Sequence, residues 1–172
     1  MDFVDVSALF IDSVLSKVIP ERKWFVQCIE QLDEEDITWA PTNESNSIAN
    51  LVSHIRGTVH SRIEILLFDI PDTREREKEF EKGLILTKEQ VLRIGMEAFN
   101  LIIQYLEKMK EQPQLLTSQP YLKKPALTYS AFNNETTAMN LLIQMVREVH
   151  FHTGQIIYIA KMRKGELKWK YD

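Results

Sequence analysis

Apolar residues recur at spacings of three and four along four separate stretches of the chain, which predicts four amphipathic helices. We expect them at Phe3 to about Leu32, Asn46 or Ser47 to about Ile70, Thr87 to about Glu111, and Asn134–Thr136 to Lys164. Pro20 interrupts the first stretch, and we expect a kink or brief break because proline removes a backbone donor and clashes with the preceding turn. Thr87 and Gln90 form a capping-box pattern that marks the start of the third helix.

The connecting segments differ in character. Asp33–Ser45 has the composition of a loop, and the mixed-charge run Thr73–Gly83 is interpreted as a solvated linker or a frayed helix. Pro113–Asn134 lacks helical periodicity, and two pieces of it, Tyr121–Leu122 and Leu127–Tyr129, could form short strands. Four helices with one long crossover predict an all-α, four-helix bundle with a long, partly extended connection before the last helix.

Composition restricts the class of protein. The 172 residues are close to the size of one domain, so we expect a single domain over residues 1–172. The net charge of −4 argues against a nucleic-acid partner, and no run of 18 apolar residues suggests a membrane span. The single cysteine, Cys28, excludes an internal disulfide and is expected in the core; it fits a cytoplasmic protein, as does the acidic N-terminus.

Histidines on two of the predicted helices supply candidate chemistry. Glu148 and His152 stand four residues apart, about 40° apart around the helix axis, so both can point at one object. His150 lies more than about 150° from Glu148, and His60 is far around its helix from His54. These positions select His54, Glu148 and His152 as a candidate metal site. The alternative is that the three are unrelated flank residues, with Glu148 a solvated carboxylate.

Two segments raise the weight of the metal interpretation. The stretch NSIANLVSHIRGTVHSR at residues 46–62 and HTGQI at residues 152–156 resemble the DinB/YfiT-like superfamily of metalloenzymes, and more closely a small bacterial branch of it. The helix order, the Trp39–Pro41 lead-in, the charged linker and the long connection also fit, so the resemblance covers nearly the whole chain.

The resemblance implies a four-helix bundle, often a homodimer, in which three histidines bind a divalent metal such as nickel or zinc. His54 matches the first ligand and His152 the third, whereas Glu148 stands where the pattern has histidine. Two histidines and one carboxylate suit Zn, Ni, Mn or Fe(II). The same exchange would also fit a metal site that has been lost. Thr58 is a second departure, at a position where the branch has asparagine.

Two classes of function remain open. The resemblance implies a metal-dependent enzyme, either an S-transferase that uses a low-molecular-weight thiol or a hydrolase. Gln155 would then orient a ligand or a water molecule, unless it is a plain surface amide. Arg62 would recognise a substrate carboxylate or, alternatively, form an ion pair inside the bundle. The other class is a non-catalytic dimer or ligand-binding protein with a degenerate site.

Overall fold

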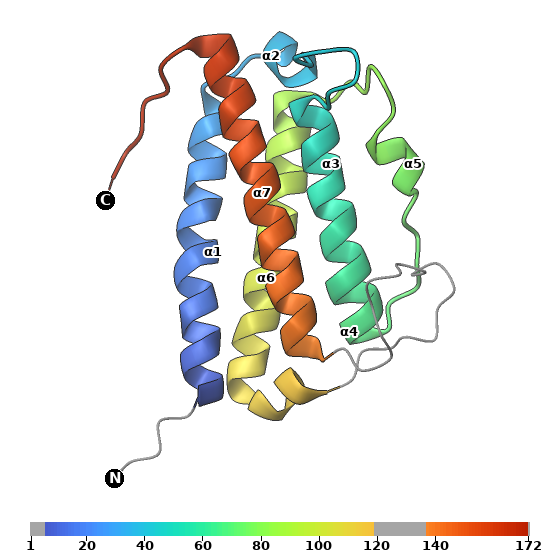
Figure 1. The fold of residues 1–172 in the computed structure, drawn as a ribbon, viewed down its shortest axis with the longest axis vertical. Coiled ribbons are helices and arrows are strands. Elements are labelled where there is room, and N and C mark those ends of the chain that lie inside the picture. The colour runs from blue at the N-terminus through green and yellow to red at the C-terminus, as the bar shows by residue number, and fades with distance from the viewer. Residues whose placement is uncertain (1–5, 119–136, 172) are drawn as a thin grey trace.

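Four long helical segments form the body of the protein (Figure 1). The structure, a computed structural model, describes residues 6–118 and 137–171. The segments are α1 (Val6–Glu30), α3 (Ile48–Val59) with its continuation, α6 (Lys88–Glu111) and α7 (Ala138–Lys164). Within the two described ranges no strand occurs. The predicted all-α helical bundle is therefore confirmed.

The helices pack in a ring in which α6 and α7 each contact both α1 and α3. The interior is filled by apolar side chains from all four, among them Phe25, Ile55, Phe99 and Met145. Cys28 belongs to this core as predicted, and burial raises the pKa of its thiol to about 12. None of the helices in the described part of the chain is both long and apolar enough to cross a bilayer.

The first helix runs without a break through Pro20. The expected interruption does not occur, because the buried Val18 and Phe25 anchor the turns on either side to the core and tertiary packing outweighs the local cost of proline. Of the predicted helix, residues 3–5 lie outside the described residues.

The second predicted helix is continuous but not uniform. Ser47, not Asn46, caps it, and the Ser47–Asn50 pair forms a capping box. The α-helix α3 widens into a π-helical segment, η1 (His60–Ile65), and ends as α4 (Leu66–Phe68). Segments of π-helix are rare and occur frequently beside functional sites.

Among the described residues, three short helices lie outside the four predicted ones: α2 (Glu34–Thr38) in a predicted loop, α5 (Arg76–Glu79) in the run interpreted as a solvated linker or frayed helix, and the 3-10 helix η2 (Pro113–Thr117) at the start of the long connection. Helix α2 follows Asp33, and its buried Asp36 is bound by Arg163 and Lys164 at the end of α7. Helix α5 lies against α3. The two predicted short strands lie outside the described residues, which resume at Thr137, the N-cap of α7.

Candidate metal centre

The side chains of His54, Glu148 and His152 meet between α3 and α7. One ligand atom from each lies within 4.8 Å of the others. The two imidazole rings are 4.8 Å apart, edge to face. Among the described residues no other cluster of three or more such side chains could hold a metal ion. The structure thus brings together the residues that the helix geometry selects, while their role as metal ligands stays a prediction.

The ring of His54 is held from behind by a carboxylate. Its Nδ1–H donates a hydrogen bond of 2.8 Å to Oε2 of Glu79, which leaves the Nε2 lone pair for a ligand. Arg74 binds both oxygens of Glu79, at 2.6 and 2.8 Å, and Phe80 packs on the imidazole. Burial alone would raise the pKa of Glu79, but the hydrogen bonds from Arg74 and His54 outweigh it and hold the pKa below its usual value. The carboxylate is therefore charged and accepts the hydrogen bond.

Burial also determines the protonation state of His54. It lowers the pKa of the imidazole, and the hydrogen bond to Glu79 only partly offsets this effect. The neutral ring, which is the form that binds metals, is therefore favoured near pH 7.

His152 is oriented in the same way by an amide. Its Nδ1–H donates to Oε1 of Gln155 at 2.8 Å, so its Nε2 is also left free, 3.7 Å from Oε2 of Glu148. The predicted orienting role of Gln155 thus takes a specific form, in which the amide supports a candidate ligand. The other oxygen of Glu148 lies 3.3 Å from the exposed guanidinium of Arg147.

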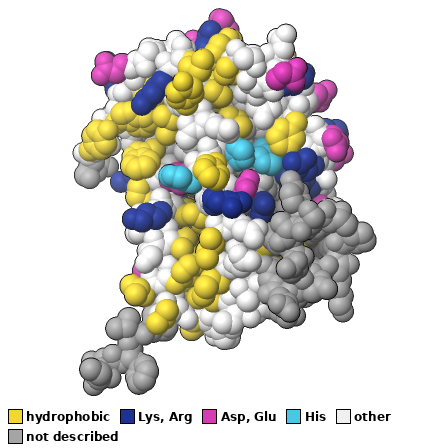
Figure 2. Space-filling model, viewed as in Figure 1, with side chains coloured by type: hydrophobic (Ala, Val, Ile, Leu, Met, Phe, Trp, Pro, Cys, Tyr) yellow, Lys and Arg dark blue, Asp and Glu magenta, His cyan; other side chains and the backbone are white. Residues whose placement is uncertain are grey.

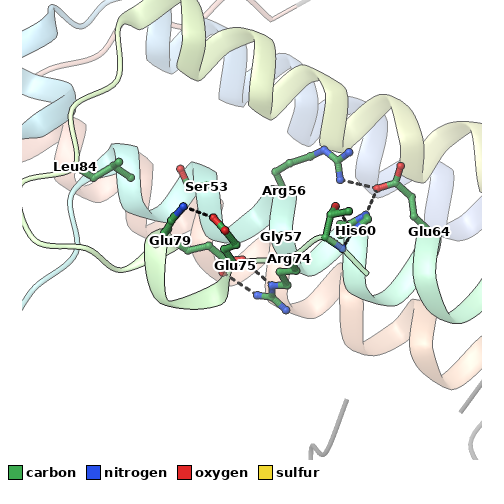
Figure 3. A pocket seen from close by; sticks show the side chains of 11 residues that line it. Ser53, Arg56, Gly57, His60, Glu64, Arg74, Glu75, Glu79 and Leu84 are labelled. Carbon is green, nitrogen blue, oxygen red and sulfur yellow. Dashed lines mark hydrogen bonds and ion pairs between the residues drawn. The ribbon is translucent and has the colours of Figure 1, made fainter. Parts of the chain in front are cut away.

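Helix α5 reaches the centre through two residues of α3. The amide of Asn50 donates hydrogen bonds to the backbone carbonyls of Glu79 (3.0 Å) and Glu81 (2.9 Å). Gly57 gives the Glu79 carboxylate room, since a Cβ there would lie 1.9 Å from Oε1 of Glu79. Figure 3 shows Arg74 and Glu79 crossing α3 beside Gly57.

Sequence reasoning missed Glu79. The interpretation of residues 73–83 as a solvated linker describes the exposed Glu75, Glu77 and Lys78, but it is wrong for Glu79, which is buried. One signal was present. Phe80 is the one apolar residue in that run, and it marks where the segment packs on the bundle.

The remaining candidates lie elsewhere. As the helix geometry predicts, His60 and His150 stay outside the cluster: His60 binds Glu64 at 2.7 Å, and His150 lies 3.3 Å from the buried Glu21 of α1. Arg62 is partly buried in η1, and both interpretations of it stay predictions.

A family model described as "Protein of unknown function (DUF1572)" matches residues 5–171. The chain belongs to this family. No functionally curated protein matches it. Among solved structures, this DUF1572 protein is similar to one titled "Crystal structure of the conserved protein of locus from Enterococcus faecalis", with a TM-score of 0.62 and 16% identity over 96% of this chain and 99% of that one. At that identity the likeness supports the fold alone, so the DinB/YfiT-like relationship stays a prediction.

Proposed function

We propose that this DUF1572 protein binds a divalent metal ion through His54, Glu148 and His152, and that it belongs to the DinB/YfiT-like metalloenzymes. One observation carries the proposal: both imidazoles have Nδ1 bound to an acceptor, so that Nε2 of each is left for the common point beside Glu148. Metal-binding histidines almost always have such a partner on the second nitrogen.

The three candidate ligands are of the types that bind a divalent metal ion. Two imidazoles and one carboxylate suit Zn, Ni, Mn or Fe(II) and leave coordination positions open for water or substrate. Ligand atoms around a tetrahedral zinc are roughly 3.4 Å apart. The three side chains would therefore draw together by about an ångström on binding such an ion.

The charge of the centre affects which chemistry a bound metal would support. When bound, the metal would act as a Lewis acid that lowers the pKa of a coordinated thiol or water. The carboxylate of Glu148 reduces the net charge, so a bound water is less acidic than beside three neutral imidazoles. A thiol starts from a pKa of about 8.5, far below that of water, and needs less help to ionise. A zinc ion held by two histidines and a glutamate nevertheless activates water in several peptidases, so we keep both a thiol-dependent S-transferase and a hydrolase.

A second candidate is a non-catalytic dimer or ligand-binding protein. The contact between Arg147 and Glu148 favours it, because an arginine near the carboxylate competes with a cation for the same oxygens. Arg147 is 61% exposed on its side chain, so solvent weakens this pair and we rank the candidate second.

The test is metal analysis of protein purified without a nickel column. We expect close to one Zn, Ni, Mn or Fe per wild-type chain, and a loss of at least about tenfold in His54→Ala and His152→Ala because each removes one of three ligands. His150→Ala is the matched control, since it removes an exposed histidine of the same helix that lies outside the cluster. Metal below about 0.1 per chain in the wild type would contradict the proposal.

Catalysis is tested separately. The metal-loaded protein is incubated with several bacterial thiols and chlorodinitrobenzene, and the rate is compared with that of metal-stripped protein and of His54→Ala. An S-transferase should lose its rate in both controls. Equal rates in all three would support the non-catalytic candidate.

A further inference from the structure

A groove of about 660 Å³ lies beside the candidate metal centre. One wall is the exposed face of α7, with Phe151, Tyr158 and Met162 at 61%, 68% and 52% exposure. The facing rim is the loop after α2, where Glu44 lines the groove. Figure 2 shows hydrophobic side chains gathered over the upper part of α7. The volume is within the usual range for pockets that bind small organic molecules.

Gly154 lines this groove on the exposed face of α7. It sits in the middle of α7, where glycine costs roughly 0.5–1 kcal/mol relative to alanine. A Cβ at this position would meet nothing within 4 Å, so no contact in the described structure requires a glycine. What the missing side chain provides is space in the groove, between the turns that carry Phe151 and Tyr158.

The groove adjoins the metal centre through shared residues. Gln155 lines it and also accepts the hydrogen bond from Nδ1 of His152. Leu51, another lining residue, precedes His54 by one turn of α3. A molecule in the groove would therefore lie next to Gln155, the amide that supports the candidate ligand His152.

The charges of the groove select the chemistry of its occupant. Glu44 is the one charged side chain among its lining residues, and none of them is Lys, Arg or His. Aromatic faces from Phe151 and Tyr158 also attract cations. An anionic head group would be repelled, whereas an apolar body with a neutral or cationic head finds complementary surroundings.

A pocket between α3, η1 and the segment that carries α5 is a poorer candidate. It has a volume of about 560 Å³ and is lined by several cationic side chains (Figure 3). These cations are already engaged: Arg56 with Glu64, Arg74 with Glu79, and Lys78 with Glu75. A ligand there would have to break an existing ion pair for each charge that it used.

We propose that the groove between α7 and the loop after α2 is the binding subsite for the organic substrate of the metal centre, and that it takes a molecule with an aromatic or alkyl body and a neutral or cationic head group. As an assignment of substrate class this rests on the proposed function. The binding itself does not require the metal.

The test uses three probes with one body: naphthylmethylamine, naphthylmethanol and naphthoate, titrated into the full-length protein by calorimetry. We expect the amine and the alcohol to bind roughly two- to fivefold more tightly than naphthoate, because the carboxylates of the probe and of the exposed Glu44 repel each other. Glu44→Gln should bring the affinity for naphthoate close to that for the alcohol. Equal affinity for all three probes would overturn the proposal.

Two variants of one residue test the location. Gly154→Leu fills the groove and should weaken binding of the amine and the alcohol by about tenfold or more. Gly154→Ala adds only a Cβ and should retain binding, with thermal unfolding showing that both variants fold. Unchanged binding in Gly154→Leu would overturn the proposal. So would sedimentation showing a wild-type dimer that Gly154→Leu converts to a monomer, because the groove would then belong to a subunit interface.

The experiments distinguish a failure of the groove proposal from a failure of the metal proposal. His54→Ala should no longer bind the metal but should still bind the probes. Gly154→Leu should no longer bind the probes but should still bind the metal. Loss of probe binding in His54→Ala alone would contradict a groove that binds independently of the ion.

Discussion

Glu79 and Gln155 each accept a hydrogen bond from Nδ1 of a candidate ligand, although they come from unlike settings. Glu79 is buried in a short helix and is bound by Arg74, whereas Gln155 is exposed on the same helix as His152. In both cases the acceptor selects the tautomer that presents Nε2. The two side chains therefore fix the direction of the imidazoles before any ion arrives.

We expect Glu79→Gln to weaken zinc binding by about tenfold or more, because the neutral amide loses the pairing with Arg74 and is a weaker acceptor for His54. The measurement is competition with a chromophoric chelator. Glu75→Gln is the matched control, since Glu75 is an exposed acid of the same segment. Equal affinity in the two variants would show that Glu79 does not position the ligand.

Glu21 is a buried residue of α1. Its carboxyl group lies against α7, on a different face of that helix from the candidate metal ligands. Burial raises its pKa, and the nearby His150 only partly opposes the shift. From near pH 4.5 upward, the folded protein therefore binds more protons at this residue than the unfolded chain does. The contribution of Glu21 to the free energy of unfolding falls as pH rises through this window.

Glu21→Gln should therefore gain stability relative to the wild type as pH rises from about 4.5 to 7. Urea unfolding of both proteins at several pH values measures the difference. If the difference in the free energy of unfolding between the two proteins did not change with pH, the raised pKa of Glu21 would be contradicted.

Among the elements, α5 is held against α3 in part by the side chain of Asn50. Asn50 completes the capping box of α3 and also holds the backbone at Glu79 and Glu81. Short helices such as α5 are marginal on their own, so tertiary contacts determine whether they form. Asn50 thus links the start of α3 to the support of His54.

We expect Asn50→Ala to cost roughly 2–3 kcal/mol of stability, since it loses a cap and two buried hydrogen bonds, and to weaken metal binding through displacement of Glu79. Denaturant unfolding and chelator competition measure the two effects. Gln90→Ala, which removes the corresponding residue of the capping box at α6, should cost stability alone. If Asn50→Ala kept full metal affinity, α5 would have to be held by other contacts.

The sequence predicted the long elements and not the short ones. The Thr87–Gln90 cap and the amphipathic α6 are local patterns, and the structure confirms both. Helices α2 and α5 span only five and four residues, too few to show a period. Asp36 of α2 is held by the distant Arg163 and Lys164, which no local pattern reveals.

At the scale of the whole molecule, the order of the helices around the bundle brings the candidate ligands together. Helix α7 contacts α3 directly, so a residue from the second helix meets residues from the last. Residues 119–136, which the structure does not describe, lie between α6 and α7 in the sequence. The assembly state is not decided by these contacts, and the homodimer stays a prediction.

Sedimentation at micromolar concentration should give a particle of twice the 20.2 kDa chain mass if the resemblance to DinB/YfiT-like dimers holds. In that case Gly154→Leu should leave the dimer intact, because we assign the groove to a small molecule. A particle of one chain mass would refute the dimer without affecting the metal site.

The sequence alone determined the helices, their apolar faces, and the relation of Glu148 to His152, because each depends on spacing along one helix. It also excluded His60 and His150 from the cluster by the same arithmetic. Only the tertiary structure decided that α3 lies beside α7 with His54 facing His152, that Glu79 is folded back beneath His54, and that Gly154 opens onto a groove. These features depend on contacts between residues distant in the chain, and a periodic pattern records which face of a helix is buried but not which partner buries it.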